Sequence, residues 1–268
     1  MTQVNLGRNL SEGKKIAISA AIITKNEAER LAGCLESLSL ADEVIVVDSG
    51  SVDNTLEIAR HYNCKVFQEE WKGYGLQKQS AIDKCSHEWV LVVDADERIP
   101  PATWTTIGLM LQNHQSETDA FNFPRKNSYN GRWLKHGYEW PDRVTRLLNR
   151  GRARMDGSIV HENVVAARIM ELDVSLIHLK RYAMDDYLQK LNSYSTFLAK
   201  QTVLSNPHRK SSVTTAFLSF LGHFGRAYVL KKGFLDGKEG LIIAFTEALH
   251  SFYKHIKILE LQGKIINS

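Results

Sequence analysis

Apolar runs alternate with amphipathic segments along the first hundred residues. Short apolar or β-branched runs occupy residues 16–23, 43–47, 64–67 and 89–93, and each precedes a segment with helical spacing or a helix start. Strands that alternate with helices predict an α/β fold, a parallel sheet covered by helices on both faces. In such sheets ligands bind beyond the carboxyl ends of the strands.

The pattern changes twice further along the chain. Strand-like runs at 119–125, 144–150 and 173–179 lie between loops rich in glycine, arginine and aromatic residues, which predicts a mixed sheet. From about residue 185 the chain is helical, and a glycine-rich turn at 231–240 separates two apolar stripes at 3.6-residue spacing. The stripes are Val213, Phe217, Phe220, Leu221, Phe224 and Tyr228, and Leu241, Phe245, Leu249, Phe252, Ile256 and Leu259. We therefore expect a flexible segment at 1–15, an α/β domain at 16–183 and a helical extension at 184–268.

The composition is that of an ordinary globular protein, with 43% hydrophobic and 24% charged residues in 268. The three cysteines, Cys34, Cys64 and Cys85, lack CxxC spacing, which favours reduced thiols in a reducing compartment. A polar N-terminus predicts no secretory signal. No apolar stretch is long enough to predict a membrane-spanning helix.

The net charge of +4 is distributed unevenly. Residues 125–154 hold nine basic and two acidic residues, and residues 205–268 hold nine basic and four acidic residues. Such clusters indicate either an anionic partner, such as nucleic acid, anionic lipid or a phosphorylated sugar, or a solvated basic face.

The segment VVDADE carries the strongest chemical pattern. Asp94 ends a buried strand, and Asp96 follows two residues later. Residues i and i+2 of an extended segment face the same side, so both carboxylates can meet one cation. Hard oxygen ligands suit Mg²⁺ or Mn²⁺, which usually also bind substrate phosphates. The alternative for so short a motif is a solvated turn at a strand end.

Two further loops place polar side chains on the same rim of the predicted sheet. Asp48 ends the second strand, where a carboxylate can accept hydrogen bonds from a ribose or a base, and Ser51 and Asp53 follow in the turn to the next helix. The first strand leads into its helix through a run that includes Thr24, Asn26 and Glu27. For Ser51, Asp53 and the first-loop residues, helix capping is the alternative interpretation.

Together these segments resemble family 2 glycosyltransferases, which have the GT-A fold. The resemblance is carried by AIITKNEAERLAGCLESL, DEVIVVDSGSVDNTLEIA and WVLVVDADERI in that order, and covers about residues 16 to 260. The later segments EEWKGYGLQKQSA, FPRKNSYNGRWLKHG, WPDRVTRLLNRG, IVHENV and KKGFLDGKEG are similar to the bacterial lipopolysaccharide inner-core glucosyltransferase subgroup (WaaE/KdtX type). The resemblance implies a Rossmann-like nucleotide-diphospho-sugar transferase fold with a mixed central sheet, helices on both faces and a C-terminal helical extension. It also implies a nucleotide-sugar half at 16–118 and an acceptor half at 119–183.

The resemblance also implies roles for single residues. The nucleotide-sugar site would comprise Thr24, Asn26, Glu27, Asp48, Ser51, Asp53, Gln77, Lys78 and Asp94. Asp94 and Asp96 would bind the divalent cation, Mg²⁺ or Mn²⁺. An acidic residue would act as the base of an inverting transfer of one hexose, glucose from UDP-glucose. Glu162 is the first candidate for this base and Asp142 the second, and His161 would orient Glu162 or touch the acceptor.

The basic stretch would then hold an anionic glycolipid acceptor, phosphorylated Kdo-bearing lipid A–heptose. Arginine binds phosphate and carboxylate through two parallel hydrogen bonds, and aromatic rings stack on sugars. The alternative for the aromatic residues is that they cover the sheet. The expected acceptor-binding residues are Arg125, Arg132, Trp140, Arg143, Arg146 and His161.

Several alternatives remain beside this interpretation. Another donor, a lipid-linked capsule or exopolysaccharide acceptor, and a non-catalytic nucleotide-sugar-binding module are all compatible with the fold. Nucleic acid is not expected as a partner, because no recognised module for it is present. The helical stripes, flanked by Lys231, Lys232, Lys254 and Lys257, either pack on the rest of the protein or lie on an anionic membrane. We expect a cytoplasmic protein, peripheral on the inner face of the cytoplasmic membrane.

Overall fold

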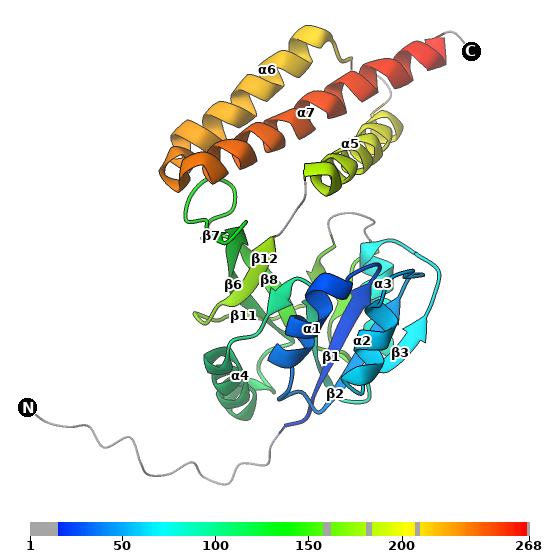
Figure 1. Cartoon of the computed structure of the whole chain (residues 1–268), viewed down its shortest axis with the longest axis vertical. Coiled ribbons are helices and arrows are strands. Elements are labelled where there is room, and N and C mark those ends of the chain that lie inside the picture. Colours follow the sequence, from blue (N-terminus) through cyan, green and yellow to red (C-terminus); the bar gives the residue numbers. More distant parts are fainter. Residues whose placement is uncertain (1–15, 158–161, 181–183, 207–209, 267–268) are drawn as a thin grey trace, which may run out of the picture. The chain divides into compact units, whose positions relative to one another are not determined.

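The computed structural model describes residues 16–157, 162–180, 184–206 and 210–266 of the chain. The chain divides into two compact units (Figure 1). Unit 1 comprises Met1–Phe123 and Val144–Leu176, and unit 2 comprises Pro124–Arg143 and Ile177–Ser268. Part of the expected acceptor half, residues 124–143, thus belongs to the same unit as the C-terminal helices.

Parallel strands begin the central sheet, as the sequence predicts. Its strand order is β3-β2-β1-β4-β8-β6-β12-β5, with β11 and β7 paired to β6. Strands β1 to β4 are parallel, and β8 runs antiparallel to β4. The bounds are β1 Ile18–Thr24, β2 Glu43–Asp48, β3 Lys65–Gln68, β4 Trp89–Asp94, β5 Glu97–Arg98, β6 Ala120–Tyr129, β7 Arg132–Trp133, β8 Arg143–Asn149, β11 Ile169–Glu171 and β12 Leu176–Lys180. A separate two-stranded sheet joins β9 Arg154–Met155 to β10 Val164–Val165.

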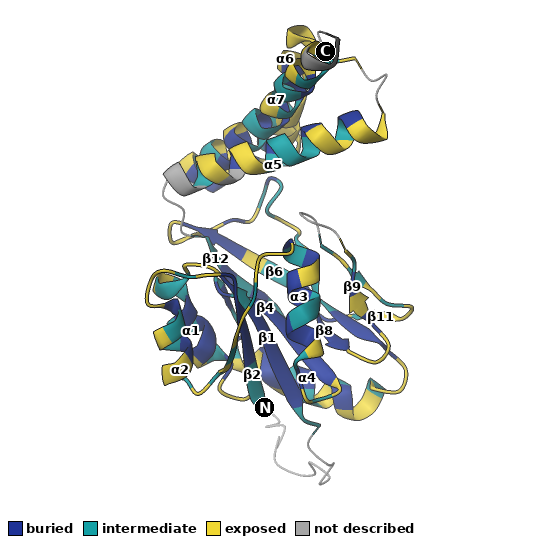
Figure 2. Cartoon of the chain, turned by 90° about the vertical axis from the view of Figure 1, so that its right-hand side faces the viewer, coloured by how far each residue is buried: buried dark blue, intermediate teal, exposed yellow. Residues whose placement is uncertain are grey.

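Helices cover both faces of the sheet in unit 1 (Figure 2). Successive strand residues point to opposite faces, so Val46 belongs to one apolar core while Ile45 and Val47 belong to the other. The first core takes side chains from α1 Ala28–Ser37, α2 Thr55–His61 and α4 Pro101–His114, and the second takes them from α3 Tyr74–Asp83. The predicted α/β class, with its mixed sheet, is therefore confirmed.

Unit 2 contains the C-terminal helices. They are α5 Met184–Ser205, α6 Val213–Phe224, the π-helix η1 Gly225–Leu230, the 3₁₀-helix η2 Gly233–Asp236 and α7 Gly237–Ile266. Helices α6 and α7 run antiparallel as a hairpin, with η1 and η2 at its closed end (Figure 1). The ring of Phe245 in α7 contacts Phe220 and Phe224 of α6, with centroids 5.4 and 6.5 Å apart. Part of the first predicted stripe is thus a helix–helix contact.

Helix α7 also packs against α5. Ala199, Val203 and Ile258 form a small buried core between these helices. The ammonium of Lys257, one of the lysines considered for membrane contact, donates hydrogen bonds to Asn192 and Ser195 of α5. Within the described residues, no helix is both long and apolar enough to cross a membrane.

Candidate active site

Hydrogen bonds to its backbone fix the turn after β4. The backbone N–H of Asp94 donates to Glu97 Oε2 at 3.1 Å, and the Cys34 thiol donates to the Asp94 carbonyl at 3.5 Å. Burial raises the pKa of the Cys34 thiol, so the thiol is a neutral donor. The Arg98 guanidinium binds the carbonyls of Ala95 and Glu97 at 3.1 and 2.8 Å. These contacts fix the direction in which the carboxylates of the DADE segment leave the sheet.

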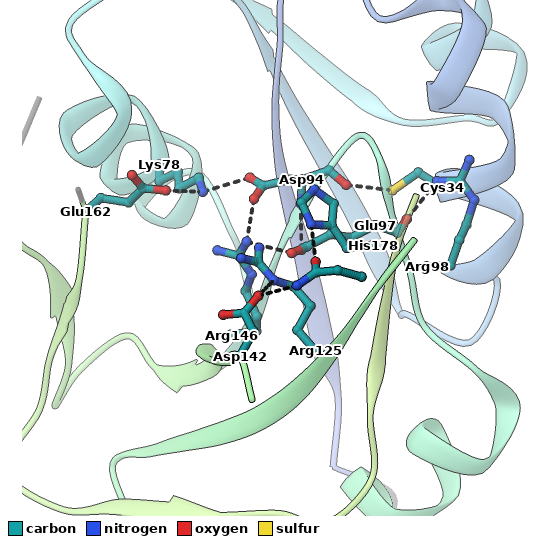
Figure 3. Close-up of polar contacts among 11 residues, drawn as sticks. Cys34, Lys78, Asp94, Glu97, Arg98, Arg125, Asp142, Arg146, Glu162 and His178 are labelled. Carbon is teal, nitrogen blue, oxygen red and sulfur yellow. Dashed lines mark hydrogen bonds and ion pairs between the residues drawn. The ribbon is translucent and has the colours of Figure 1, made fainter. Parts of the chain in front are cut away.

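The Asp94 carboxylate lies between two buried cations (Figure 3). Lys78 Nζ is 2.7 Å from Asp94 Oδ1, and an Arg146 Nη atom pairs with Asp94 Oδ2. The same Arg146 atom is 2.7 Å from Glu97 Oε1, and the Glu97 side chain is fully buried. Burial alone would lower the pKa of Arg146, but the charges of Asp94 and Glu97 raise it above its usual value. Arg146 therefore stays charged inside the protein, which requires these anionic partners.

Glu162 joins the same group through Lys78. Its Oε1 atom is 2.6 Å from Lys78 Nζ, although the two residues are 84 positions apart. The ion-pair cluster thus runs in the order Glu162, Lys78, Asp94, Arg146 and Glu97, with three carboxylates and two cations (Figure 3). Asp96 lies half-buried beside it in the turn.

Two donors in this region have no hydrogen-bond partner among the described residues. They are Nε2 of Gln77, a side chain with no exposed surface, and Nε of Arg146. Gln77 Oε1 is used, since it accepts the backbone N–H of Lys72 at 3.2 Å. A buried unpaired donor costs about 1–3 kcal/mol, which an acceptor oxygen would recover.

The first two loops are joined by side chains at the ends of β1 and β2. Asp48 is fully buried and accepts hydrogen bonds from the Thr24 hydroxyl at 3.0 Å and from the N–H groups of Gly50 and Ser51 at 3.0 and 2.8 Å. The Ser51 hydroxyl also donates to Asp48, so both carboxylate oxygens are engaged within the protein. Asp48 therefore shapes the loop directly, in addition to any contact with a nucleotide.

Asn26 and Asp53 bind the neighbouring loop. Asn26 has a left-handed backbone conformation (φ 56°), and its side-chain oxygen accepts the N–H of Val52 at 2.8 Å. Asp53 accepts the N–H of Ala28 at 3.1 Å and of Thr55 at 3.0 Å, the first residues of α1 and α2. Burial would raise the pKa of Asp53, but these hydrogen bonds lower it. Asp53 thus binds the first N–H groups of two helices, as the capping interpretation expects. The backbone N–H of Glu27, which follows Asn26, donates to the Thr55 hydroxyl at 2.8 Å.

The second base candidate, Asp142, lies in unit 2. Its Oδ2 accepts hydrogen bonds from Arg125 Nε at 2.8 Å and from Asn127 Nδ2 at 2.9 Å. Burial would raise the pKa of Asp142, but Arg125 and Asn127 lower it below its usual value. His178 Nδ1 lies 2.8 Å from the side-chain oxygen of Asn127, which joins a buried histidine to the group (Figure 3).

The predicted acceptor residues fall in different surroundings. Arg143 and Trp140 are exposed, and Arg132 is half-exposed at 3.7 Å from Glu239. Arg146 is instead buried in the ion-pair cluster of unit 1, because the second half of β8 is covered on both faces. His161 lies outside the described residues.

Asp94 and Asp96 are too few to bind a divalent cation by themselves, but they suit a cation that also takes ligands from a bound phosphate. Within the described residues, no group of three or more His, Cys, Asp or Glu side chains is gathered as a metal site. Asp96 lies in a turn after β4 and not in an extended segment, so the expected i and i+2 alignment does not apply. Asp94 and Asp96 still offer hard oxygens close in sequence, and Mg²⁺ is commonly bound by one or two carboxylates together with phosphates and water. The residues therefore fit a Mg²⁺ or Mn²⁺ ion that also contacts phosphates.

Sequence reasoning missed Glu97, Asn127 and His178. Glu97 follows the predicted metal residues directly, and a charged residue inside a buried turn was the available indication. Asn127 and His178 are 51 residues apart, and nothing in the local pattern relates them.

An open α/β sheet with polar side chains at the carboxyl ends of its parallel strands defines a ligand-binding α/β protein. The sequence matches the glycosyl transferase family 2 model over residues 19–175, more than half of the chain. The chain belongs to glycosyltransferase family 2.

Curated relatives match nearly the whole chain. The lipopolysaccharide core biosynthesis glycosyltransferase LpsC of Rhizobium meliloti is 32% identical over 90% of this chain and 94% of its own. An uncharacterised glycosyltransferase of Rickettsia prowazekii is 29% identical over 93% of this chain and 89% of its own. Among solved structures, Staphylococcus aureus TarS in complex with UDP-GlcNAc is 17% identical, covers 94% of this chain and 91% of its own, and superposes with a TM-score of 0.45.

Proposed function

We propose that this glycosyltransferase moves a single hexose, glucose from UDP-glucose, to an anionic acceptor of the lipopolysaccharide core, in one metal-dependent inverting displacement. The observation that carries the proposal is the Asp94 carboxylate at the end of β4, held between Lys78 and Arg146 and joined to Glu162 through Lys78. The acceptor class is supported by the relative LpsC, which is named for lipopolysaccharide core biosynthesis.

The donor site we propose uses Gln77 and Lys78 for the diphosphate. Lys78 supplies a buried ammonium, and Gln77 Nε2 supplies a buried donor with no partner among the described residues. When bound, a divalent cation on Asp94 and Asp96 would stabilise the charge that develops on the departing diphosphate, as a Lewis acid does. The carboxylates would otherwise repel the diphosphate, which accounts for the proposed metal dependence.

Glu162 is our proposed base. Lys78 fixes the position of its Oε1 atom, and the second carboxylate oxygen is the proposed acceptor of the proton from the attacking hydroxyl. Asp142 is the second candidate, and its Oδ2 is held by Arg125 and Asn127, which lower its pKa. Attack on the face opposite the leaving diphosphate inverts the anomeric centre and needs no covalent intermediate.

We also propose that the protein works in the cytoplasm at the inner membrane surface. The three cysteines are all free thiols, as a reducing compartment would keep them. A lipid-linked acceptor has its sugars at the membrane surface, and the exposed Arg143 offers a cation for its acidic groups.

The test is nucleotide release from UDP-, GDP- and dTDP-sugars with Mg²⁺, Mn²⁺ or EDTA, and sugar transfer to purified core acceptor. We expect UDP release from UDP-glucose, and a loss of about 100-fold or more on EDTA treatment or in Asp96→Ala. Glu162→Gln should keep UDP binding by calorimetry and lose transfer. The matched control is Glu57→Gln, an exposed carboxylate on α2. Unchanged turnover in Asp96→Ala would contradict the metal role, and normal transfer by Glu162→Gln would contradict the base.

A further inference from the structure

Large apolar side chains are exposed at the closed end of the α6–α7 hairpin. We call residues 225–241 the hairpin tip. Leu230 is 77% exposed and Val229 58%, and three other apolar side chains of the tip are about half-exposed. These three are Phe234, Leu235 and Leu241. Five exposed apolar side chains within 13 residues form an apolar patch of the kind that marks an interaction site.

The apolar surface continues along α6. Val213, Phe217 and Leu221 are spaced four residues apart, lie on one face of the helix and are all exposed. The aromatic rings that contact α7 belong to Phe220 and Phe224, so the pairing of the two helices leaves the first set uncovered.

The exposed charge at the tip is entirely basic among the described residues. Arg226, Lys232 and Lys238 are exposed and Lys231 is half-exposed. The two acidic residues of residues 213–246, Asp236 and Glu239, are instead buried. The Asp236 carboxylate accepts the N–H groups of Lys135 and His136 at 3.0 and 2.9 Å, and Glu239 faces Arg132 at 3.7 Å. The two acids are thus buried inside unit 2, while Arg226, Lys232 and Lys238 are exposed.

The tip has a fixed shape. Gly237 has a positive φ of 68°, and a Cβ atom at Gly240 would lie 2.0 Å from the carbonyl oxygen of Gly233. Only glycine permits this close approach. The apolar side chains are therefore held outward by a tightly closed turn, and no rearrangement is needed to present them.

We propose that the hairpin tip docks onto an anionic phospholipid bilayer. Val229, Leu230, Phe234 and Leu235 enter the interface between headgroups and acyl chains, and the surrounding lysines and arginine contact lipid phosphates. The methylene groups of each lysine lie along the apolar surface, and the ammonium group reaches the lipid headgroups. The proposal deepens the proposed function, on which its biological role rests, because a lipid-linked acceptor is met at such a surface.

Charge favours a bilayer over a second copy of the chain. A symmetric dimer through this surface would place the tips' basic residues against each other, and like charges oppose that contact. An anionic bilayer satisfies the apolar and the basic side chains together.

The test is flotation of the full chain with vesicles of phosphatidylcholine alone or mixed with phosphatidylglycerol. We expect binding to the anionic vesicles that weakens as salt is raised. The double variant Leu230→Ser with Leu235→Ser and the double variant Arg226→Gln with Lys238→Gln should each weaken binding about tenfold. The matched control is Leu204→Ser with Lys200→Gln, at exposed positions on α5, and it should bind as the original chain does.

Three results would overturn the proposal. The first is unchanged binding in both tip variants, and the second is equal binding to neutral and anionic vesicles. The third is a dimer in light scattering that the leucine variant converts to a monomer while vesicle binding is absent. UDP release measured without vesicles reports on the proposed function separately. Loss of that activity with intact flotation would count against the enzyme assignment and not against the tip.

Discussion

Basic residues play different parts in the two units. In unit 1, Lys78 and Arg146 are almost fully buried and are each bound to two carboxylates. In unit 2, Arg143, Lys232 and Lys238 are exposed. A buried cation needs fixed anions, because they offset the free-energy cost of removing it from water. An exposed cation keeps its water and can bind an anionic partner in place of that water. Charge counted along a sequence therefore says little about function until burial is known.

The largest expected effect comes from breaking a buried pair. Arg146→Met leaves Asp94 and Glu97 without their shared cation, so we expect a loss of about 3–5 kcal/mol in the free energy of unfolding. Urea unfolding followed by circular dichroism measures it. Arg143→Met on the same strand is the matched control and should change stability by no more than about 0.5 kcal/mol. Equal losses in the two variants would remove the contrast between buried and exposed cations.

A smaller effect is expected where one carboxylate organises a loop. Asp48→Ala leaves the Thr24 hydroxyl and the N–H groups of Gly50 and Ser51 without their acceptor, which costs about 2–3 kcal/mol. The comparison variant is Asp53→Ala, whose side chain is exposed and whose loss should cost about 1 kcal/mol. Thermal unfolding of both variants orders them. A larger loss in Asp53→Ala would show that burial is not what makes Asp48 important.

The sequence pattern predicts the parallel strands well. The run at 89–93 corresponds to β4 Trp89–Asp94, and the run at 43–47 corresponds to β2 Glu43–Asp48. Such runs are local and are buried on both faces, so composition alone identifies them. The position of Asp94 at a strand end follows from the same pattern.

The ion-pair cluster could not be predicted in this way. Lys78 and Glu162 are 84 residues apart, and Arg146 and Asp94 are 52 apart. Only the sheet order brings their strands and helices together. The stretch 125–154 is rich in basic residues throughout. Within three residues, however, β8 passes from the exposed Arg143 to the buried Arg146.

The helical stripe showed a related limit. Helical spacing predicts that Val213, Phe217 and Phe220 share one face, but Val213 and Phe217 are exposed while the ring of Phe220 contacts Phe245 of α7. Which part of a wide apolar face is covered depends on the partner helix. Spacing therefore identifies the helix and leaves its exposed side undetermined.

A third kind of pair, a buried carboxylate bonded to an exposed lysine, can be tested by pH. Burial would raise the pKa of Glu43, but hydrogen bonds from Lys65, Ser19 and Ser86 lower it from 4.5 to about 2. The folded protein thus resists protonation more than the unfolded chain does, so Glu43 stabilises the fold above about pH 4.5, and this stability is lost as the pH falls towards about 2. Urea unfolding of Glu43→Gln between pH 7 and pH 2 should show a weaker acid dependence than the original chain, and Glu57→Gln should not. Equal acid dependence in all three would contradict the assigned pairing.

The smallest effect is expected on the exposed side. Arg143→Ala removes one exposed cation, so we expect folding to lose little, and the contribution should appear when an anionic acceptor binds. A charge-assisted hydrogen bond to such an acceptor is worth about 1.5 kcal/mol, which corresponds to a rise of about tenfold in acceptor KM. Steady-state transfer assays at low and high salt measure this rise, with UDP release in the absence of acceptor and the melting temperature unchanged. Because raised salt screens an exposed contact, the difference between Arg143→Ala and the original chain should shrink as salt increases. An unchanged acceptor KM at low salt would mean that this arginine belongs to a solvated basic face. The buried cations of unit 1 would then serve the active site, and the exposed cations of unit 2 would serve membrane binding and not acceptor binding.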